Sequence, residues 1–189
     1  MYSVGILVFD GVEELDFAGP LEVFGTAAKL DPKSFTVLTI GVRGREAKGT
    51  NGLVVEADRT LEGSPRTDIL VVPGGRGTRR EMHNPELLRF VRDAAESCDL
   101  VASVCTGALI LASAGLLDGK KATTHAAALL ELRAFPKVKV EHRRYLQQGN
   151  IITSAGISAG IDMALFVVGK LCGESLRLAT AREMEYRLR

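Results

Sequence analysis

One cysteine stands where a buried strand is predicted to turn into a helix. Residues 100–104 form a short apolar run, as in a strand that is buried on both faces, and Cys105 follows directly. Helical spacing of apolar residues then continues over residues 106–114. Open α/β sheets keep their sites at the carboxyl ends of strands, and a helix N-terminus lowers the pKa of a nearby thiol. The sequence therefore predicts a nucleophilic Cys105 thiolate on a turn like a nucleophile elbow.

Small and polar residues that could assist this thiol occur in two segments. Thr106 can place a hydroxyl beside the sulfur, and Gly107 is small enough to let a ligand approach the turn. A second buried strand, predicted over residues 68–72, ends just before Gly74 and Gly75. The backbone N–H groups of these glycines could stabilise a developing negative charge, although an ordinary glycine turn is the alternative.

The third candidate group is acidic. Asp10, Glu13, Glu14 and Asp16 lie in the loop and turn predicted after the first strand, and the neighbours of Asp16 in the sequence are apolar. Partial burial beside a thiolate would raise the pKa of the Asp16 carboxyl, so that it could be protonated near neutrality and donate a proton. A carboxylate that caps a helix is the alternative.

Short apolar runs alternate with longer amphipathic stretches along the chain, which favours an α/β fold. Pro20 fits the first turn of the first helix, where its missing N–H has no bond to lose. Asn51-Gly52 is a turn signal and predicts a hairpin that includes residues 53–57. The other predicted strands are residues 3–9, 34–40, 138–140 and 151–153, and the other predicted helices are near residues 87–95, 126–132, 157–171 and 175–186.

Charge and cysteine usage exclude several classes of protein. The 189 residues include 24 basic and 23 acidic side chains, a net charge of +1, so no field of one sign favours nucleic acid or a membrane surface as a partner. No basic stretch precedes the first apolar run, so we expect a cytoplasmic protein. Cys98, Cys105 and Cys172 are odd in number and lack CxxC spacing, which argues against a disulfide framework or a zinc site. Cys98 and Cys172 are interpreted as small hydrophobic residues, and residues 1–189 as one domain.

Three motifs occur in an order and spacing that resemble one known superfamily. They are Phe9-Asp-Gly-Val-Glu-Glu-Leu-Asp-Phe-Ala-Gly-Pro-Leu-Glu-Val-Phe, Val72-Pro-Gly-Gly and Val104-Cys-Thr-Gly-Ala, with Ala122-Thr-Thr-His125 adding to the match. Over nearly its whole length the chain resembles the ThiJ/PfpI superfamily of class I glutamine-amidotransferase-like proteins. The resemblance implies a single-domain three-layer sandwich with a mostly parallel central sheet, flavodoxin-like in its layout. It also implies a homodimer.

The residues beside the cysteine narrow the activity that this resemblance implies. Proteases of the PfpI type carry His directly after the cysteine, where this chain has Thr106, and the glutamine amidotransferases use a His-x-Glu that this chain lacks. An aspartate in the first motif with Cys-Thr at the elbow is instead similar to the isonitrile hydratases. This similarity implies that Cys105 adds to a small-molecule isonitrile while Asp16 moves the proton, with no cofactor and no metal. Thr106 and the Gly75 amide would hold a covalent thioimidate that water converts to an N-substituted formamide.

His125 matches the superfamily's Thr-Thr-His segment and could approach Cys105 from a neighbouring strand end. The superfamily usually follows it with a large aromatic residue, where this chain has Ala126. That difference predicts an enlarged pocket or an altered substrate.

Three other functions use the same cysteine. Regulators of the AraC type carry a similar domain as a ligand sensor, but the balanced charge here argues against direct DNA binding. A redox or stress sensor would oxidise an accessible Cys105 thiolate to a sulfenic or sulfinic acid. Glyoxalase-like or deglycase activity on dicarbonyls also occurs around this superfamily.

Overall fold

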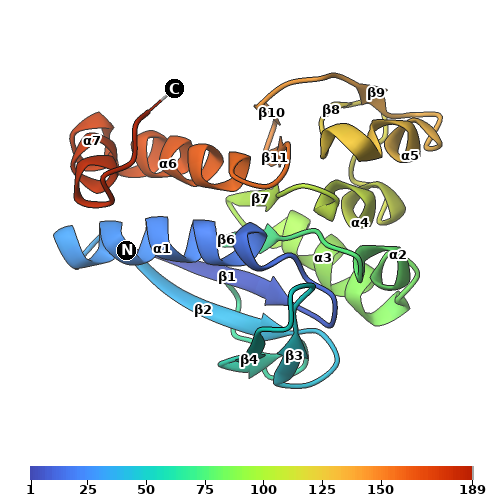
Figure 1. Cartoon of the computed structure of the whole chain (residues 1–189), viewed down its shortest axis with the longest axis horizontal. Coiled ribbons are helices and arrows are strands. Elements are labelled where there is room, and N and C mark those ends of the chain that lie inside the picture. The colour runs from blue at the N-terminus through green and yellow to red at the C-terminus, as the bar shows by residue number, and fades with distance from the viewer. Residues whose placement is uncertain (189) are drawn as a thin grey trace.

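A seven-stranded sheet runs through the computed structural model, which describes residues 1–188 (Figure 1). Within this seven-stranded sheet every neighbouring pair of strands is parallel except the first pair in the order that follows. In spatial order the strands are β10 (Tyr145–Gln148), β11 (Ile151–Ser154), β7 (Leu100–Ser103), β6 (Ile69–Val72), β1 (Tyr2–Val8), β2 (Phe35–Gly41) and β5 (Arg59–Thr60). The prediction of a mostly parallel sheet is confirmed.

Helices cover both faces of this sheet. The connection from β1 to β2 through α1 (Glu14–Leu30) and the one from β6 to β7 through α3 (Pro85–Ser97) run in opposite directions across the sheet. Because such crossovers are right-handed, the two helices lie on opposite faces. α6 (Ala159–Cys172) and α7 (Glu174–Glu183) pack with α1, and α4 (Gly107–Ser113) packs with α3. The result is the expected three-layer sandwich.

Shorter elements surround the carboxyl end of the sheet. The predicted hairpin is present as β3 (Glu46–Lys48) and β4 (Val54–Glu56), which pair antiparallel outside the main sheet. A one-turn helix α2 (Thr78–Glu81) follows β6. Later in the chain, a 3-10 turn over Ala126–Ala128 leads into α5 (Leu129–Arg133). This segment lies beside a small parallel pair of strands, β8 (Lys121–Ala122) and β9 (Lys139–Val140). None of the helices within residues 1–188 is long and apolar enough to cross a lipid bilayer.

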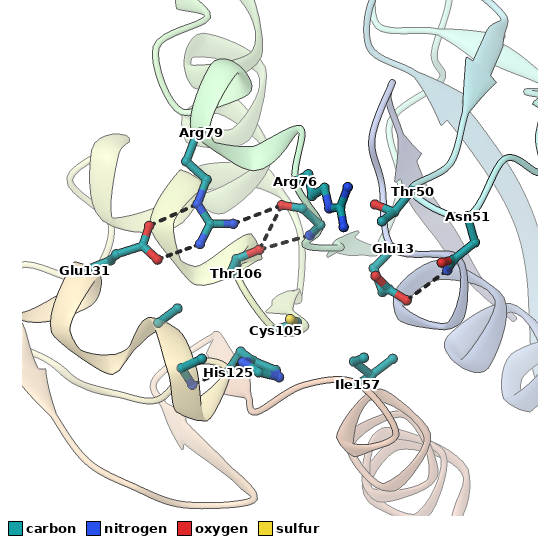
Figure 2. A pocket seen from close by; sticks show the side chains of 13 residues that line it. Glu13, Thr50, Asn51, Arg76, Arg79, Cys105, Thr106, His125, Glu131 and Ile157 are labelled. Carbon is teal, nitrogen blue, oxygen red and sulfur yellow. Dashed lines mark hydrogen bonds and ion pairs between the residues drawn. The ribbon is translucent and has the colours of Figure 1, made fainter.

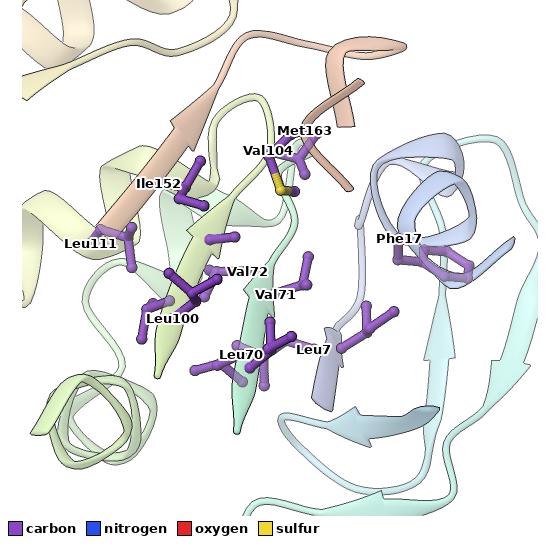
Figure 3. Close-up of a cluster of buried hydrophobic side chains, with 14 of the residues drawn as sticks. Leu7, Phe17, Leu70, Val71, Val72, Leu100, Val104, Leu111, Ile152 and Met163 are labelled. Atoms are coloured by element: carbon purple, nitrogen blue, oxygen red, sulfur yellow. The ribbon is translucent and has the colours of Figure 1, made fainter. Parts of the chain in front are cut away.

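The core consists of the central strands and the helix faces that pack on them (Figure 3). β6 and β7 are buried along their whole length, as predicted for strands that are covered on both faces. Leu70 and Val71 have no exposed surface, and each side chain of this kind contributes about 1.5–3 kcal/mol on burial. The packing holds the carboxyl ends of β1, β6 and β7 at fixed positions relative to one another.

The first helix begins earlier than the position of Pro20 in the sequence indicated. α1 begins at Glu14, so Pro20 lies inside the helix and not in its first turn. Proline removes the bond that its N–H would make to the carbonyl of Asp16. The helix continues because Pro20 is buried beside Gly160 of α6 and because Glu14 and Asp16 favour a helix N-terminus. Asp16 therefore belongs to the first turn of α1 and not to the preceding loop.

Candidate active site

The site lies where the strand connections change direction. The chain leaves β1 toward β2, whereas it leaves β6 toward β7 on the other side, and ligands of open α/β sheets bind at such a switch point. The loops that follow β1, β6 and β7 meet there: Val12 pairs with Gly75 in a β-bridge, and the Glu13 N–H donates to the Gly74 carbonyl at 2.9 Å. Three segments that are far apart in the sequence thus form one crevice.

Cys105 occupies a strained elbow between β7 and α4. Its φ of 55° lies in the left-handed region, which disfavours an L-residue by about 1–2 kcal/mol. Hydrogen bonds hold this conformation: the Cys105 N–H donates to the Ser154 and Ala155 carbonyls at 3.2 and 3.3 Å, and the buried Thr124 hydroxyl donates to the Cys105 carbonyl at 2.7 Å. The predicted sharp turn from strand to helix is present at Cys105.

Gly107 lies beneath the elbow and does not line the pocket, contrary to the prediction. A Cβ at this position would lie 2.0 Å from the Val72 carbonyl oxygen and 2.9 Å from that of Pro73. Only glycine lets the first turn of α4 pass so close to the end of β6. Its role is to allow the elbow to form.

Asp16 lies under Cys105 and has no exposed surface. Its Oδ2 accepts the Gly74 N–H at 3.1 Å, and its Oδ1 has no hydrogen-bond partner among the described atoms. Burial, with a smaller contribution from the charge of Glu13, raises the pKa of Asp16 from 3.8 to about 7, although hydrogen bonds from Gly74 and Cys105 lower it. The expected protonation near neutrality follows from this raised pKa.

The expectation of a lowered thiol pKa is wrong for this structure. Burial and the negative charge of Asp16 together raise the pKa of Cys105 to about 12, although hydrogen bonding by Thr106 lowers it. α4 has only seven residues, and its dipole is outweighed by burial and by the carboxylate. Cys105 and Asp16 therefore act as a pair. Between pH values of about 7 and 12 the two side chains together hold one proton.

The backbone amides proposed as oxyanion donors already have partners. The Gly74 N–H donates to Asp16, and the Gly75 N–H donates to the Thr106 Oγ1 at 2.9 Å. The Thr106 hydroxyl also contacts the Thr78 hydroxyl at 3.0 Å. The prediction that both amides face the crevice as free donors is therefore wrong, and the Thr106 hydroxyl also donates to the Gly75 carbonyl at 3.3 Å.

A cavity of about 420 Å³ opens above Cys105 (Figure 2). The structure brings Cys105, Thr106, Gly75 and His125 together on its wall, as predicted. Glu13 of the acidic loop also lines it, together with residues that the sequence analysis does not identify, among them Asn51, Arg76, Arg79, Glu131 and Ile157. The Asn51-Gly52 turn signal marks one of their loops, but no local pattern shows that the loop reaches the cysteine.

The other two cysteines lie away from this cavity. Cys98 is buried, and its Sγ donates to the Thr67 carbonyl at 3.0 Å, which agrees with a structural role. Cys172 is half-buried in α6.

Gly156 packs against both Cys105 and His125. A Cβ at Gly156 would lie 2.4 Å from the His125 Cδ2 and 2.7 Å from the Cys105 Sγ. Gly156→Ala should displace the imidazole and slow alkylation of Cys105 by iodoacetamide at least about tenfold, as measured by mass spectrometry. Gly25→Ala, in a helix with open space around it, is the control and should stabilise the protein by ~0.5–1 kcal/mol. An unchanged alkylation rate in the Gly156 variant would contradict this packing.

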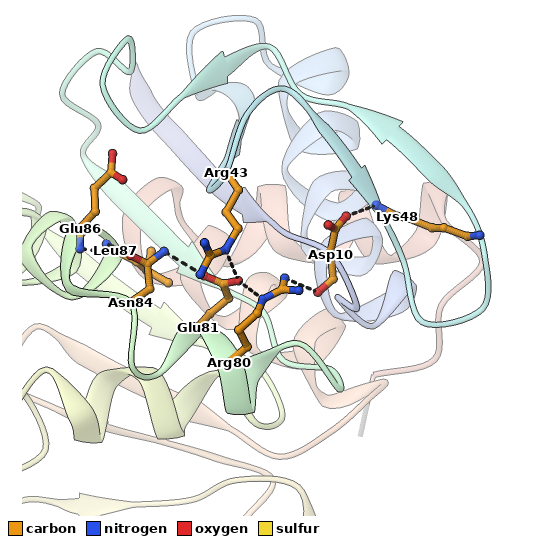
Figure 4. A network of polar contacts seen from close by, with 8 residues as sticks. All are labelled: Asp10, Arg43, Lys48, Arg80, Glu81, Asn84, Glu86 and Leu87. Atoms are coloured by element: carbon orange, nitrogen blue, oxygen red, sulfur yellow. Dashed lines mark hydrogen bonds and ion pairs between the residues drawn. The ribbon is translucent and has the colours of Figure 1, made fainter.

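A buried carboxylate fixes the helix that supports the cavity (Figure 4). The fully buried side chain of Glu81, at the end of α2, accepts from Arg43 at 2.9 Å, from Arg80 at 2.7 Å and from the Asn84 amide at 2.9 Å. Burial alone would raise the pKa of Glu81, but these three hydrogen bonds and the charge of Arg43 lower it. The network ties α2 to the end of β2 and to the N-cap of α3.

Glu81→Gln should destabilise the protein because two guanidinium groups lose their shared charge partner. We expect the free energy of unfolding at pH 7 to fall by about 1–3 kcal/mol, measured by urea denaturation. Since the pKa of Glu81 is lowered in the folded state, its contribution is present above the unfolded pKa and is lost as pH falls. The difference between wild type and variant should therefore shrink toward low pH, and the exposed Glu62→Gln should show neither effect.

Several known proteins are similar to this chain in sequence and fold. The chain is 34% identical over 184 residues to the isonitrile hydratase of Pseudomonas putida, covering 97% of this chain and 78% of that protein. It is 30% identical over 186 residues to the HTH-type transcriptional regulator GbdR of Pseudomonas aeruginosa, covering 97% of this chain but only 50% of the regulator. The crystal structure of a ThiJ/PfpI family protein from Pseudomonas syringae superposes with a TM-score of 0.90 at 29% identity, covering 100% of this chain and 76% of that one. The DJ-1/PfpI family model matches residues 2–170, and the chain belongs to the DJ-1/PfpI family.

Proposed function

We propose that this protein hydrates isonitriles to N-substituted formamides, with Cys105 as the nucleophile. The observation that carries the proposal is the buried pair of Asp16 and Cys105, which holds one transferable proton at the base of an open cavity. The similarity to an isonitrile hydratase over 97% of the chain supports the choice of substrate.

In the first step the Cys105 sulfur adds to the terminal carbon of the isonitrile. The singly protonated pair supplies both reactants, because moving its proton from sulfur to the Asp16 carboxyl yields a thiolate and a carboxylic acid. The C–S bond forms, and the electron pair left on the carbon takes the proton from Asp16. The product is a thioimidate, R–N=CH–S–Cys105, with Asp16 ionised.

In the second step water adds to the C=N bond of the thioimidate. The Asp16 carboxylate takes a proton from water as its oxygen bonds to the carbon and passes that proton to the nitrogen, which becomes N–H. Collapse of the tetrahedral species breaks the C–S bond and releases R–NH–CHO, while the hydroxyl proton of that species returns to Asp16 and Cys105. The Thr106 amide and hydroxyl stabilise the departing thiolate, and the pair recovers its single proton.

Formation of formamide is the direct test. Purified protein incubated with cyclohexyl isocyanide should release N-cyclohexylformamide in an amount that greatly exceeds the amount of protein, detected by liquid chromatography with mass spectrometry. No turnover with this and several other isonitriles would reject the proposal.

A second candidate function is ligand sensing without turnover. The similarity to a transcriptional regulator along 97% of this chain favours it, because that protein carries a domain like this one in half its length. Saturable isonitrile binding by calorimetry without formamide release would support sensing. A peroxide sensor is less well supported, because the raised pKa of Cys105 leaves little thiolate for oxidation at neutral pH.

The family resemblance also leads us to propose a homodimer, and we separately propose a cytoplasmic location. Sedimentation velocity at micromolar concentration measures the assembly state, and cell fractionation measures the location.

A further inference from the structure

We propose that the cavity takes isonitriles that carry a carboxylate and that Arg76 binds this group; the choice of reacting group rests on the proposed function. Arg76 lines the cavity together with Cys105 and Thr106 (Figure 2). A guanidinium matches a carboxylate with two parallel N–H donors.

The backbone on both sides of Arg76 is held in place. Gly75 has a φ of 124°, and a Cβ there would lie 2.3 Å from the Gly11 carbonyl oxygen; a Cβ on Gly77 would lie 2.0 Å from that of Asp10. The Gly77 N–H also donates to the Gly11 carbonyl at 3.0 Å. Arg76 therefore projects from a rigid base whose neighbours have no side chains to cover it.

The other charged groups at the cavity mouth already have partners. The Arg79 guanidinium makes two hydrogen bonds to the Glu131 carboxylate, and Glu13 is turned toward the Asn51 amide (Figure 2). Among residues 1–188 the Arg76 side chain has no hydrogen bond or ion pair, so all five of its N–H donors remain available. Arg76 is therefore the cation of the described lining that no carboxylate pairs with, whereas Glu13 keeps its negative charge beside the neutral Asn51 amide.

The rest of the wall fits the body of such a molecule. Ala127, Ala128 and Ile157 provide a small apolar surface, while Cys105 lies at the base. One ligand could contact all of these groups. Its isonitrile carbon would lie at the Cys105 sulfur, its apolar middle against the alanines and Ile157, and its carboxylate at Arg76. Since a carboxylate is repelled by a thiolate, the positive charge of Arg76 also offsets the cost of bringing the two together.

Alkylation of Cys105 tests anion recognition without any turnover. Iodoacetate and iodoacetamide differ by one charge, and the ratio of their rates at Cys105, measured by peptide mass spectrometry, reports how the cavity receives an anion. We expect Arg76→Gln to lower this ratio about fivefold or more and Arg76→Lys to retain most of it. Cys172 of the same molecules is an internal reference, and Arg89→Gln, on the exposed surface of α3, is the control for net charge. An Arg76→Gln ratio equal to that of wild type would overturn the proposal.

Turnover of a matched pair of isonitriles then tests the substrate class. Wild type should have a kcat/KM for isocyanoacetate at least about fivefold above that for its methyl ester, and Arg76→Gln should lose this preference mainly through KM. Equal values for acid and ester in wild type would reject the carboxylate. Turnover of neither compound, with the iodoacetate effect intact, would reject hydration and leave anion binding by Arg76 standing.

Discussion

Replacing Cys105 with alanine should lower the rate of isonitrile hydration at least roughly a thousandfold. The mechanism has no covalent intermediate without the sulfur, and removal of a nucleophile generally costs more than removal of the groups that assist it. The side chain lies at the cavity base, and the elbow is held by backbone and Thr124 contacts, so the melting temperature should change by only a few degrees. The measurement is kcat with cyclohexyl isocyanide, with circular dichroism to verify folding.

Two further variants make this result specific. Cys105→Ser retains the shape and a hydroxyl but lacks a good leaving group at neutral pH, and it should be nearly as inactive as the alanine variant. Cys98→Ala removes a thiol outside the cavity and should keep full activity. Substantial turnover by Cys105→Ala would show that water is activated directly and that no thioimidate forms.

Replacing Asp16 with asparagine should stabilise the protein at alkaline pH while removing its activity. The pKa of Asp16 rises from 3.8 to about 7 on folding, so the folded state binds more protons than the unfolded state between these values. Stability must then fall as pH rises through this window, by up to about 4 kcal/mol. The asparagine side chain can still accept the Gly74 N–H and carries no charge, so the loss with pH disappears.

Urea denaturation from pH 4 to pH 9 measures this effect. The Asp16→Asn variant should exceed wild type in free energy of unfolding by about 1–4 kcal/mol at pH 8, and the two should converge near pH 4. In wild type, kcat/KM should increase through pH 7 as the pair of Asp16 and Cys105 loses its first proton. The rate of Cys105 alkylation in the Asp16→Asn variant, measured over the same pH range, should show no inflection near pH 7. Asp93→Asn, on an exposed face of α3, is the control for net charge. A wild-type stability that is flat between pH 4 and pH 8 would mean that Asp16 ionises normally.

The sequence identifies the reacting groups but not their energetics. Strand ends and glycine signals place Cys105, Asp16 and Gly75 in one crevice because parallel strands bring their carboxyl ends together. The helix dipole argument for Cys105 fails since it treats the local turn alone, whereas burial and the Asp16 charge arise from segments far away in the sequence. The same reason explains why the partners of the Gly74 and Gly75 amides were not predicted.

The cavity wall was beyond the reach of sequence patterns for a different reason. Asn51, Arg76 and Glu131 lie on loops and short helices, where the path of the chain depends on contacts and not on periodicity. Pro20 shows a related failure, since tertiary packing against α6 overrides the helix boundary that a proline suggests.

The left-handed backbone at Cys105 bears on how related sequences drift. Because an L-residue at a φ of 55° is less stable than glycine there, any descendant that no longer needs the sulfur gains stability by exchanging it for glycine. Selection for reactivity and selection for stability thus act on this residue position in opposite directions. Glycine or asparagine at the same corner is the expected mark of lineages that kept the scaffold and abandoned catalysis.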